Sequence, residues 1–357
     1  MDSAPHGEGS EPPSKRRGAV VLVAVAVALG LITTLFHLLD LDLRIENLFY
    51  RPDGGWLWRH AQPWEALYRW GTTPGLLLTI GSLVALSVGL ATRRWVRYQN
   101  GLLVIALTAI LGAGLLVNAV LKPYWGRPRP RQVEAFAGEW TYRSPHQRGT
   151  PGQGESFPCG HCTMGYLFVT LYFLRRQAPR VALVGGAFGL CYGSLVGMAR
   201  MVQGAHFPTD VIWSLGLIWA TATALHYFLL PAFSRWLKPL KEMRAGQRWA
   251  LSVILLLSVV IVTALFLTRR PYFKTFTFDL PLTADIQSLD LTSDLALERQ
   301  AFVYEAREGG RLRVHVSGFG GVAARCRVTL TAERRPGGLA LHLAGQPRGA
   351  VSDLSSA

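Results

Sequence analysis

Hydrophobic residues in this chain are concentrated in seven long runs that are separated by shorter polar stretches. A helix rises about 1.5 Å per residue, so roughly 20 residues cross about 30 Å of hydrocarbon. The pattern therefore predicts an all-α bundle of membrane helices, and the fourth run crosses only if its helix begins near Gly160. The runs cover approximately residues 18–39, 74–92, 101–121, 161–174, 181–199, 211–232 and 249–267.

Basic residues between the runs predict the orientation of the bundle. Cytoplasmic loops of membrane proteins carry an excess of Lys and Arg. This rule places the N-terminus in the cytoplasm, and it places 40–73, 122–160 and 200–210 on the outer side together with the C-terminus. The basic residues are Lys15, Arg16, Arg17, Arg93, Arg94, Arg97, Arg175, Arg176, Arg180, Arg235, Lys238, Lys241, Arg244 and Arg248.

Past Arg270 the pattern changes from long runs to the alternation that is typical of strands. Two segments, AFVYEA-REGG-RLRVHV and RVTLTAE-RRPGG-LALHL, predict hairpins with glycines at their turns. We therefore expect a small β-rich outer domain over 271–345. The polar ends, 1–17 and 346–357, are expected to be disordered, and 233–248 is expected to be a basic cytoplasmic linker.

Composition supports a membrane protein and excludes several other classes. Of the 357 residues, 50% are hydrophobic and 17% are charged, and the mean hydropathy is +0.24. These values exclude a disordered chain, a collagen-like fibre and a small disulfide scaffold. The net charge of +15 would favour nucleic acid in a soluble protein. Here membrane orientation explains it, and we expect no nucleic-acid partner.

The first outer loop carries an aromatic stretch, WLWRHAQPWEALYRW, over 56–70. Trp and Tyr are enriched where a membrane meets water. The stretch predicts an interfacial helix, and simple anchoring is favoured over ligand binding.

Three polar clusters stand at the ends of apolar runs. All three fall on the outer side in a topology that was derived from other residues. The first runs from Lys122 to Pro130, the second from Ser156 to His161, and the third from Arg200 to Asp210.

The cations of these clusters suit a phosphate. Arg129 and Arg200 can each grip phosphate through two parallel hydrogen bonds, and Lys122 adds a point charge. Phosphoryl transfer spreads charge over three equatorial oxygens, which fixed cations stabilise. Gly160 at a helix start can bring backbone N–H groups close to the same anion. Arg127 is an alternative ligand if the register shifts.

The histidines supply a nucleophile and an acid. His206 can form a covalent phosphohistidine, and Asp210, four residues on, can accept from one ring nitrogen so that the other is free to attack. Asp210 can also cap the following helix. His161 is then available to protonate the departing oxygen.

This pattern resembles the type 2 phosphatidic acid phosphatase (PAP2) family, which shares its site with vanadium haloperoxidases. The resemblance covers roughly residues 20–232. It implies a six-helix membrane core over 18–232, with the helix over 249–267 as an addition, and it implies no metal or other cofactor. The matching motifs are Lys122-x6-Arg129-Pro130, Pro158-Cys159-Gly160-His161 and Ala199-Arg200-x5-His206-x3-Asp210.

The resemblance also implies roles for residues. His206 is the expected nucleophile, Asp210 its orienter and His161 the acid, with phosphate held by Lys122, Arg129 and Arg200. Cys159 replaces a motif serine and Ala199 replaces another. A thiol is a weaker donor than a hydroxyl, so the phosphate contact of Cys159 is weakened, although its backbone N–H remains.

The phrase LDLRIENLFYRPDGGW, residues 41–56, resembles bacterial lipid A phosphatase-like members. This resemblance implies a lipid phosphate or pyrophosphate, such as lipid A or an isoprenyl pyrophosphate, at the periplasmic face of a bacterial inner membrane. The expected partners are that lipid and the bilayer. The sequence leaves the oligomeric state open.

Four other functions remain as alternatives. A lipid phosphotransferase would use the same phosphohistidine, and a vanadate haloperoxidase would use similar residues in a soluble protein. A transporter would place its ionisable residues at mid-membrane. The Cys159-Gly160-His161-Cys162 stretch matches the redox motif of disulfide isomerases, but it lacks the βαβ unit that carries that chemistry. A disulfide between the two cysteines would brace His161.

Overall fold

The computed structural model describes most of the chain and divides it into two compact units, Met1–Val259 and Val260–Ala357. The predicted tail 1–17 lies outside the described residues up to residue 13, and most of the predicted linker over 233–248 also lies outside them. The described ranges are 14–151, 154–232, 243–268, 270–280, 288–293, 310–320, 325–336, 338–348 and 351–356.

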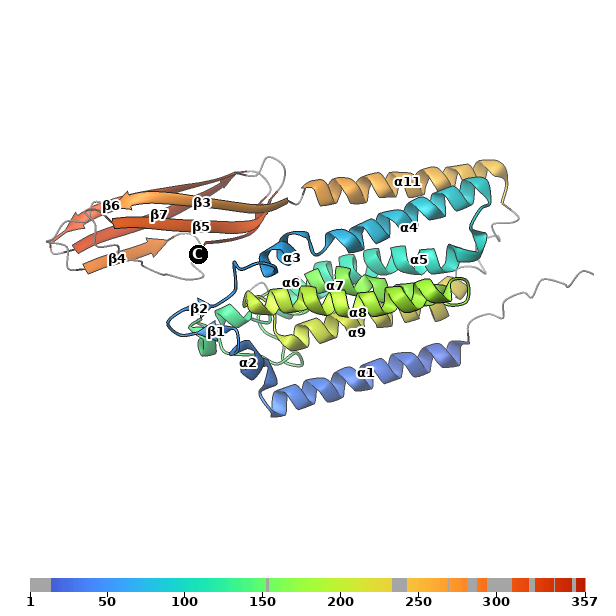
Figure 1. Ribbon diagram of the computed structural model, residues 1–357, viewed down its shortest axis with the longest axis horizontal. Helices are drawn as coiled ribbons and strands as arrows, with labels where there is room; N and C mark the ends of the chain where they lie inside the picture. The colour runs from blue at the N-terminus through green and yellow to red at the C-terminus, as the bar shows by residue number, and fades with distance from the viewer. Residues whose placement is uncertain are drawn as a thin grey trace, which may run out of the picture. The chain divides into compact units, whose positions relative to one another are not determined.

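The first unit is a bundle of apolar helices (Figure 1). Five helical segments among the described residues are long and apolar enough to cross a membrane. The chain is therefore a multi-pass membrane protein, as its hydrophobic pattern predicts. The segments are Lys15–Leu38 (α1), Trp64–Thr92 (α3, Trp64–Trp70, and α4, Thr73–Thr92), Gln99–Gln132, Pro179–Val202 (α8) and Pro208–Ala232.

Two of these segments are composite helices. Gln99–Gln132 joins α5 (Gln99–Leu107), the π-helical η2 (Thr108–Leu121), α6 (Lys122–Trp125) and the 3₁₀ turn η3 (Pro130–Gln132). Pro208–Ala232 joins α9 (Pro208–Ala224) and η6 (Leu225–Leu229). The shorter elements of this unit are α2 (Leu41–Glu46), β1 (Tyr50–Arg51), β2 (Gly55–Trp56), η1 (Val96–Tyr98) and η4 (Glu134–Phe136).

The fourth hydrophobic run forms a helical segment that falls short of the length for a crossing, and the seventh forms the 24-residue helix α11 (Ala245–Thr268). α7 (Gly160–Tyr166) begins at Gly160 as expected and continues into the 3₁₀ helix η5 (Leu167–Leu174). Because a 3₁₀ helix rises about 2 Å per residue, the two together reach about 26 Å. Within the part whose side chains are described, α11 is apolar over Ala245–Ile261. A crossing at each of these places stays a prediction.

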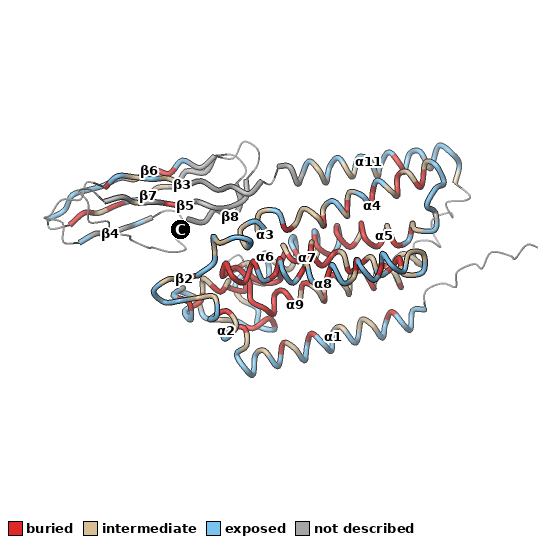
Figure 2. The backbone as a smooth tube through the Cα atoms, viewed as in Figure 1, coloured by how far each residue is buried: buried red, intermediate tan, exposed pale blue. Residues whose placement is uncertain are grey.

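Lipid-facing surface explains the exposure of α1 (Figure 2). The apolar side chains of Val20, Val23 and Leu31 are more than half exposed, which would be unfavourable in water over so large a patch. The opposite face of α1 packs on α9. There the indole N–H of Trp213 donates to Thr33 Oγ1 at 2.9 Å. One face of α1 is thus available to acyl chains.

The second unit contains two three-stranded sheets with the orders β3-β5-β8 and β4-β7-β6. Val314, Phe276 and Phe278 of the first sheet pack on Val328 and Leu343 of the second. The strands are β3 (Arg270–Leu280), β4 (Ser288–Ser293), β5 (Gly310–Gly320), β6 (Arg325–Arg335), β7 (Gly338–Arg348) and β8 (Val351–Ser356). The β-rich prediction for the region after Arg270 is therefore confirmed.

Details of this unit differ from the expectation. The hairpin predicted around residues 334–338 forms, with Arg335 opposite Gly338 in the β6–β7 pair. The first strand of the other predicted hairpin, 301–306, lies outside the described residues. Residues 351–356, expected within a disordered tail, form β8 instead. The reason is that the backbone of β5 offers ladder positions from Val316 to Gly320, which β8 fills.

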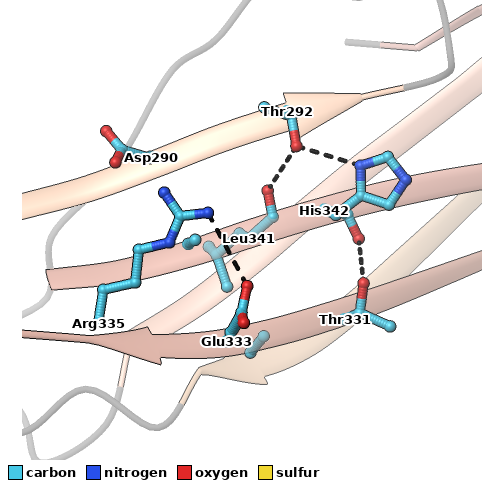
Figure 3. A pocket seen from close by; sticks show the side chains of 9 residues that line it. Asp290, Thr292, Thr331, Glu333, Arg335, Leu341 and His342 are labelled. Atoms are coloured by element: carbon cyan, nitrogen blue, oxygen red, sulfur yellow. Dashed lines mark hydrogen bonds and ion pairs between the residues drawn. The ribbon is translucent and has the colours of Figure 1, made fainter.

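The sheet β4-β7-β6 carries a shallow cavity of about 280 Å³ (Figure 3). Thr292 Oγ1 lies 3.1 Å from Nδ1 of His342, and Arg335 pairs with Glu333 at 3.8 Å. The arginine and glutamate of this pair are 60% and 78% exposed, so the pair is fully solvated and adds little stability. None of the predicted catalytic residues lines this cavity.

Candidate active site

The turn between α8 and α9 sets the spacing of Arg200 and His206. Gly204 N–H donates to the carbonyl of Met201 at 2.8 Å, and Ala205 N–H donates to the carbonyl of Arg200 at 3.0 Å. These two bonds form a Schellman motif, which needs a left-handed residue at its turn. Gly204 fills that position with φ +61°, and an added Cβ would meet the ring of Trp56 at 2.2 Å. Arg200 is therefore held in the last turn of α8, six residues before His206.

Asp210 caps the helix that follows. Its Oδ2 accepts the N–H of Phe207 at 2.8 Å, three residues before it, and Pro208 opens α9. An acid in the first turn also interacts favourably with the helix dipole. The same carboxylate accepts from Ser156 Oγ at 2.5 Å and from the guanidinium of Arg127. Asp210 is fully buried, and these contacts hold it beside His206.

His206 is oriented by a backbone carbonyl and by Asp210 behind it. Nδ1 lies 2.5 Å from the carbonyl oxygen of Ser156 and 3.6 Å from Oδ2 of Asp210. A carbonyl oxygen only accepts, so Nδ1 carries the proton and the lone pair stays on Nε2. The expectation from sequence was that Asp210 accepts from the ring. In the structure Ser156 offers the nearer acceptor to Nδ1, and Asp210 interacts with the same nitrogen from 3.6 Å.

Arg127 is the centre of a buried ionic network. Its guanidinium donates to Asp210, to Asp42 Oδ2 at 2.7 Å and to Thr209 Oγ1 at 2.9 Å, and its Nε donates to the carbonyl of Arg143 at 2.7 Å. Its side chain is completely buried, as are those of Asp42 and Asp210. Such a network is stable only when its charges are paired and hydrogen-bonded.

Asp42, on α2, completes the network from the segment that follows α1. It accepts from Thr209 through the backbone N–H at 3.0 Å and Oγ1 at 2.6 Å, and from Tyr142 Oη at 2.9 Å. Nearby Glu46 is also fully buried, and burial and then the charge of Asp42 raise its pKa well above the usual range. Burial therefore favours the protonated form of Glu46. The network thus binds α2 to the first turn of α9 and to the loop after α6.

The other arginine of the first cluster has a different environment. The side chain of Arg129 is 14% exposed, and Nη2 lies 3.5 Å from Oε2 of Glu155. The side chain of Lys122 is 17% exposed, and its Nζ lies 3.9 Å from the same oxygen. Of the two arginines that the sequence left as alternatives, only Arg127 has its donors committed inside the protein. Lys122 and Arg129 instead share one solvent-accessible carboxylate.

His161 lies among the predicted cations. Burial, and then the positive charges of Arg200, Lys122, His206 and Arg129, lower the pKa of His161 well below its ordinary value. An effect of this kind requires these groups to be close. The structure therefore brings His161 and His206 together with Lys122, Arg129 and Arg200. His161 is the second residue of α7 and is partly buried.

Cys159 and Gly160 form the start of α7 beside this cluster. The thiol of Cys159 interacts with His206 and with Cys162, and both sulfurs are present as free, buried thiols. Gly160 packs on Asn118, whose Oδ1 would lie 2.3 Å from an added Cβ. The glycine therefore permits a close helix–helix approach that any side chain would prevent. Of the described residues, no three His, Cys, Asp or Glu side chains are grouped so that they could hold a metal ion.

Sequence reasoning missed several residues that contact the predicted ones. The carbonyl of Ser156 orients His206, and Asp42 pairs with Arg127. Glu155 bridges two cations. Tyr68 of α3 contacts both Arg200 and His161. A backbone carbonyl leaves no signal in a sequence. Asp42 lies in the stretch 41–56 that resembles lipid A phosphatase-like members, and Tyr68 lies in the aromatic stretch 56–70 that predicts anchoring.

Comparison with known proteins places these residues in a family context. The PAP2 superfamily profile matches residues 102–236. Lipid A 4'-phosphatase of Francisella tularensis subsp. novicida (strain U112) is 35% identical over 120 residues, which cover 33% of this chain and 53% of that protein. The chain thus spans about half the length of the curated lipid A phosphatases that it matches.

Two further matches come from Bacillus subtilis. Phosphatidylglycerophosphatase B of strain 168 is 27% identical over 188 residues, which cover 51% of this chain and 81% of that protein. The crystal structure of a transmembrane PAP2 type phosphatidylglycerolphosphate phosphatase is 21% identical, covers 62% of this chain and 98% of that one, and gives a TM-score of 0.35.

Proposed function

We propose that this protein is a membrane phosphatase that hydrolyses a lipid phosphate through a phosphohistidine, on the premise that residues 102–236 match the PAP2 superfamily. In this proposal His206 is the nucleophile, His161 the acid and Asp210 a positioning residue. Lys122, Arg129 and Arg200 bind the phosphate together with the backbone at Cys159 and Gly160.

The observation that carries the proposal is the position of the Glu155 carboxylate. Its Oε2 lies 3.5 Å from Arg129 Nη2 and 3.9 Å from Lys122 Nζ. The site therefore already attracts an oxyanion between two of the three predicted phosphate ligands. His161 adjoins the same place, because the charges of Lys122 and Arg129 act on it. Arg200 and His206 also act electrostatically on His161, so they lie near it as well. Phosphate offers more negative charge and more acceptors than a carboxylate, so it suits the position better.

The tautomer of His206 supports the attack step. Its Nε2 lone pair attacks phosphorus, a P–N bond forms and the P–O bond to the leaving group breaks. Because Nδ1 keeps its proton, the phosphorylated ring is positively charged. The buried network beside it holds Asp42 and Asp210 against the single cation of Arg127. Its excess negative charge, 3.6 Å from Nδ1 through Asp210, favours the charged intermediate.

Proton transfer is assigned to His161. In the site without substrate its lowered pKa makes the imidazole neutral. A phosphate dianion bound among the same cations offsets their charge and favours the imidazolium, which donates to the leaving oxygen. Water then attacks the phosphohistidine, its proton returns to His161, and inorganic phosphate leaves. Substrate binding and protonation of the acid are thereby coupled.

The proposed substrate is an anionic amphiphile at the outer face of a bacterial inner membrane. The relatives named as lipid A phosphatases and as a phosphatidylglycerophosphatase support a lipid phosphate. The basic loops support a cytoplasmic N-terminus, with the site and the C-terminal unit in the periplasm. Lipid A and isoprenyl pyrophosphate are the members of this class that we favour.

A substrate panel tests the proposal directly. The purified protein is expected to release inorganic phosphate from lipid A or undecaprenyl pyrophosphate at least tenfold faster than from phosphatidic acid or phosphatidylglycerophosphate. Products are analysed by mass spectrometry, because transfer of phosphate to a second lipid or sugar would indicate a phosphotransferase. Absence of release from all four lipids by folded protein would reject the proposed function.

Substitution of Glu155 by glutamine is expected to tighten the binding of inorganic phosphate by about two- to fivefold. The carboxylate competes with phosphate for Lys122 and Arg129, and a pair 38% exposed on its acidic side contributes only about 0.2–1 kcal/mol. Product inhibition by phosphate measures the effect. Glu139→Gln, in the same outer loop, is the control and should leave the inhibition constant unchanged. Weaker inhibition in Glu155→Gln would contradict the competition.

A further inference from the structure

The ring of Tyr68 contacts two residues of the proposed site from outside the family-matched region. Tyr68 lies on α3, whereas the PAP2 match covers residues 102–236. Its ring stacks on the imidazole of His161, with centroids 5.4 Å apart and planes at 26°. The guanidinium carbon of Arg200 lies 4.3 Å from the centroid of the same ring. One side chain thus touches both the proposed acid and a proposed phosphate ligand.

Packing of α3 on α8 holds this ring in place (Figure 1). At the end of α3, the hydroxyl of Tyr192 donates to the carbonyl of Gly71 at 3.1 Å. Leu67, the neighbour of Tyr68, packs on the buried cluster that contains Cys159 and Val196. These contacts join α3 to the helices that carry Arg200 and His161. The ring is therefore part of a rigid contact and not the tip of a loose loop.

A second link joins Arg200 to the segment that precedes α3. Gln203 accepts from the Arg200 guanidinium through Oε1, and its Nε2 donates to the carbonyl of Arg59 at 3.4 Å. Arg200 is only 8% exposed. Its guanidinium is thus fixed by Gln203 at one nitrogen and by the Tyr68 ring over its carbon, which leaves the orientation of the remaining donors determined.

We propose that Tyr68 is a positioning residue whose ring holds the imidazole of His161 and the guanidinium of Arg200 in the orientations that phosphoryl transfer requires. This inference rests on the proposed function. It assigns to the aromatic stretch a part in the site itself, beyond membrane anchoring.

The ring also affects which form of His161 is stable. The charged and titratable groups that face His161 are Arg200, Lys122, His206 and Arg129, and each disfavours a second positive charge there. The face of an aromatic ring is electron-rich and attracts cations. A stacked Tyr68 therefore stabilises the imidazolium of His161 against these neighbours, in the form that a general acid needs.

The test compares variants of Tyr68 in the full-length protein with a lipid substrate that the wild type hydrolyses. Tyr68→Leu is expected to lower kcat about tenfold while KM rises less, and to move the high-pH limb of the kcat profile to lower pH. Tyr68→Phe keeps the ring and should stay within about twofold of wild type. Trp70→Leu, on the same helix and 62% exposed, is the matched control and should also stay close to wild type.

Several results would overturn the inference. One is an unchanged kcat and pH profile in Tyr68→Leu. A second is an equal loss of kcat in Tyr68→Phe, which would implicate the hydroxyl. A third is an equal loss of kcat in Trp70→Leu, which would implicate general anchoring. If Tyr68→Leu does not fold, Tyr68→Met takes its place, with the same expected values. Failure of the proposed function is a separate outcome, in which the wild type itself shows no phosphate release that depends on His206.

Discussion

Replacing His206 by alanine is expected to lower kcat by roughly 10⁴- to 10⁶-fold, the size of loss that follows removal of a catalytic nucleophile. The cause is the loss of Nε2, whose lone pair is directed by the Nδ1 contact to Ser156. Wild-type protein stopped in base during turnover of labelled lipid should carry phosphate on histidine, because the P–N bond of a phosphohistidine survives base and is hydrolysed in acid. His206→Ala should carry none, and Asp210→Asn should form and release it more slowly.

The control for this prediction is a histidine of the segment between α6 and α7. The ring of His146 contacts the ring of His37. Among the contacts described for His146, none is with a predicted site residue. His146→Ala is expected to keep kcat within about twofold of wild type. Phosphate release by purified His206→Ala at more than about one hundredth of the wild-type rate would refute the phosphohistidine mechanism.

Two arginines separated by one proline are expected to give opposite defects. Arg127→Leu should destabilise the protein by about 3–5 kcal/mol, because it leaves the carboxylates of Asp42 and Asp210 buried without their cation. Arg129→Leu removes a partly exposed side chain and should change stability by less than about 1 kcal/mol. Its activity should fall by at least about 100-fold, since a charge-assisted bond to phosphate is lost.

Thermal unfolding in detergent, followed by size-exclusion profile, separates the two effects. Asp42→Asn serves as a second probe of the network and should lower the midpoint in the same direction as Arg127→Leu, because the acceptor for Thr209 and Tyr142 loses its charge. The assignment would be wrong if Arg129→Leu unfolded while Arg127→Leu remained stable and inactive. That result would make Arg127 the phosphate ligand.

The network has a consequence for how the fold and the site depend on each other. Asp42 lies on α2, and Arg127 follows α6, whereas Asp210 lies in the first turn of α9. A charge that is buried without a partner is unfavourable, so the three segments are stable only together. The position of Asp210, and with it the electrostatic environment of His206, is therefore decided by residues that never touch substrate.

Much of the architecture could be predicted from one-dimensional pattern. The length and hydropathy of the runs predict membrane helices, because the thickness of the hydrocarbon determines how many apolar residues a crossing needs. The alternation after Arg270 predicts strands, because successive side chains of a strand point to opposite faces. The fourth run gives the weakest indication of a crossing, because α7 and η5 together are short.

The candidate site was predictable only as residue types and spacings. Arg200-x5-His206 is a local motif, and its spacing follows from the Schellman turn at Gly204. The local sequence could not decide which of Arg127 and Arg129 is buried in the protein and which reaches the proposed phosphate site. This depends on Asp42, which precedes Arg127 by 85 positions in the chain and is within hydrogen-bond distance in space.

The sequence by itself determined that this chain enters a membrane, that its last part is β-rich, and which residues carry charge and imidazole near the ends of helices. Those properties follow from composition and period, which are local. Only the tertiary structure decided that the carbonyl of Ser156 orients His206, that Arg127 is buried, and that Tyr68 contacts His161. Each of these depends on which distant segments meet, because burial and hydrogen bonding are set by neighbours in space and not along the chain.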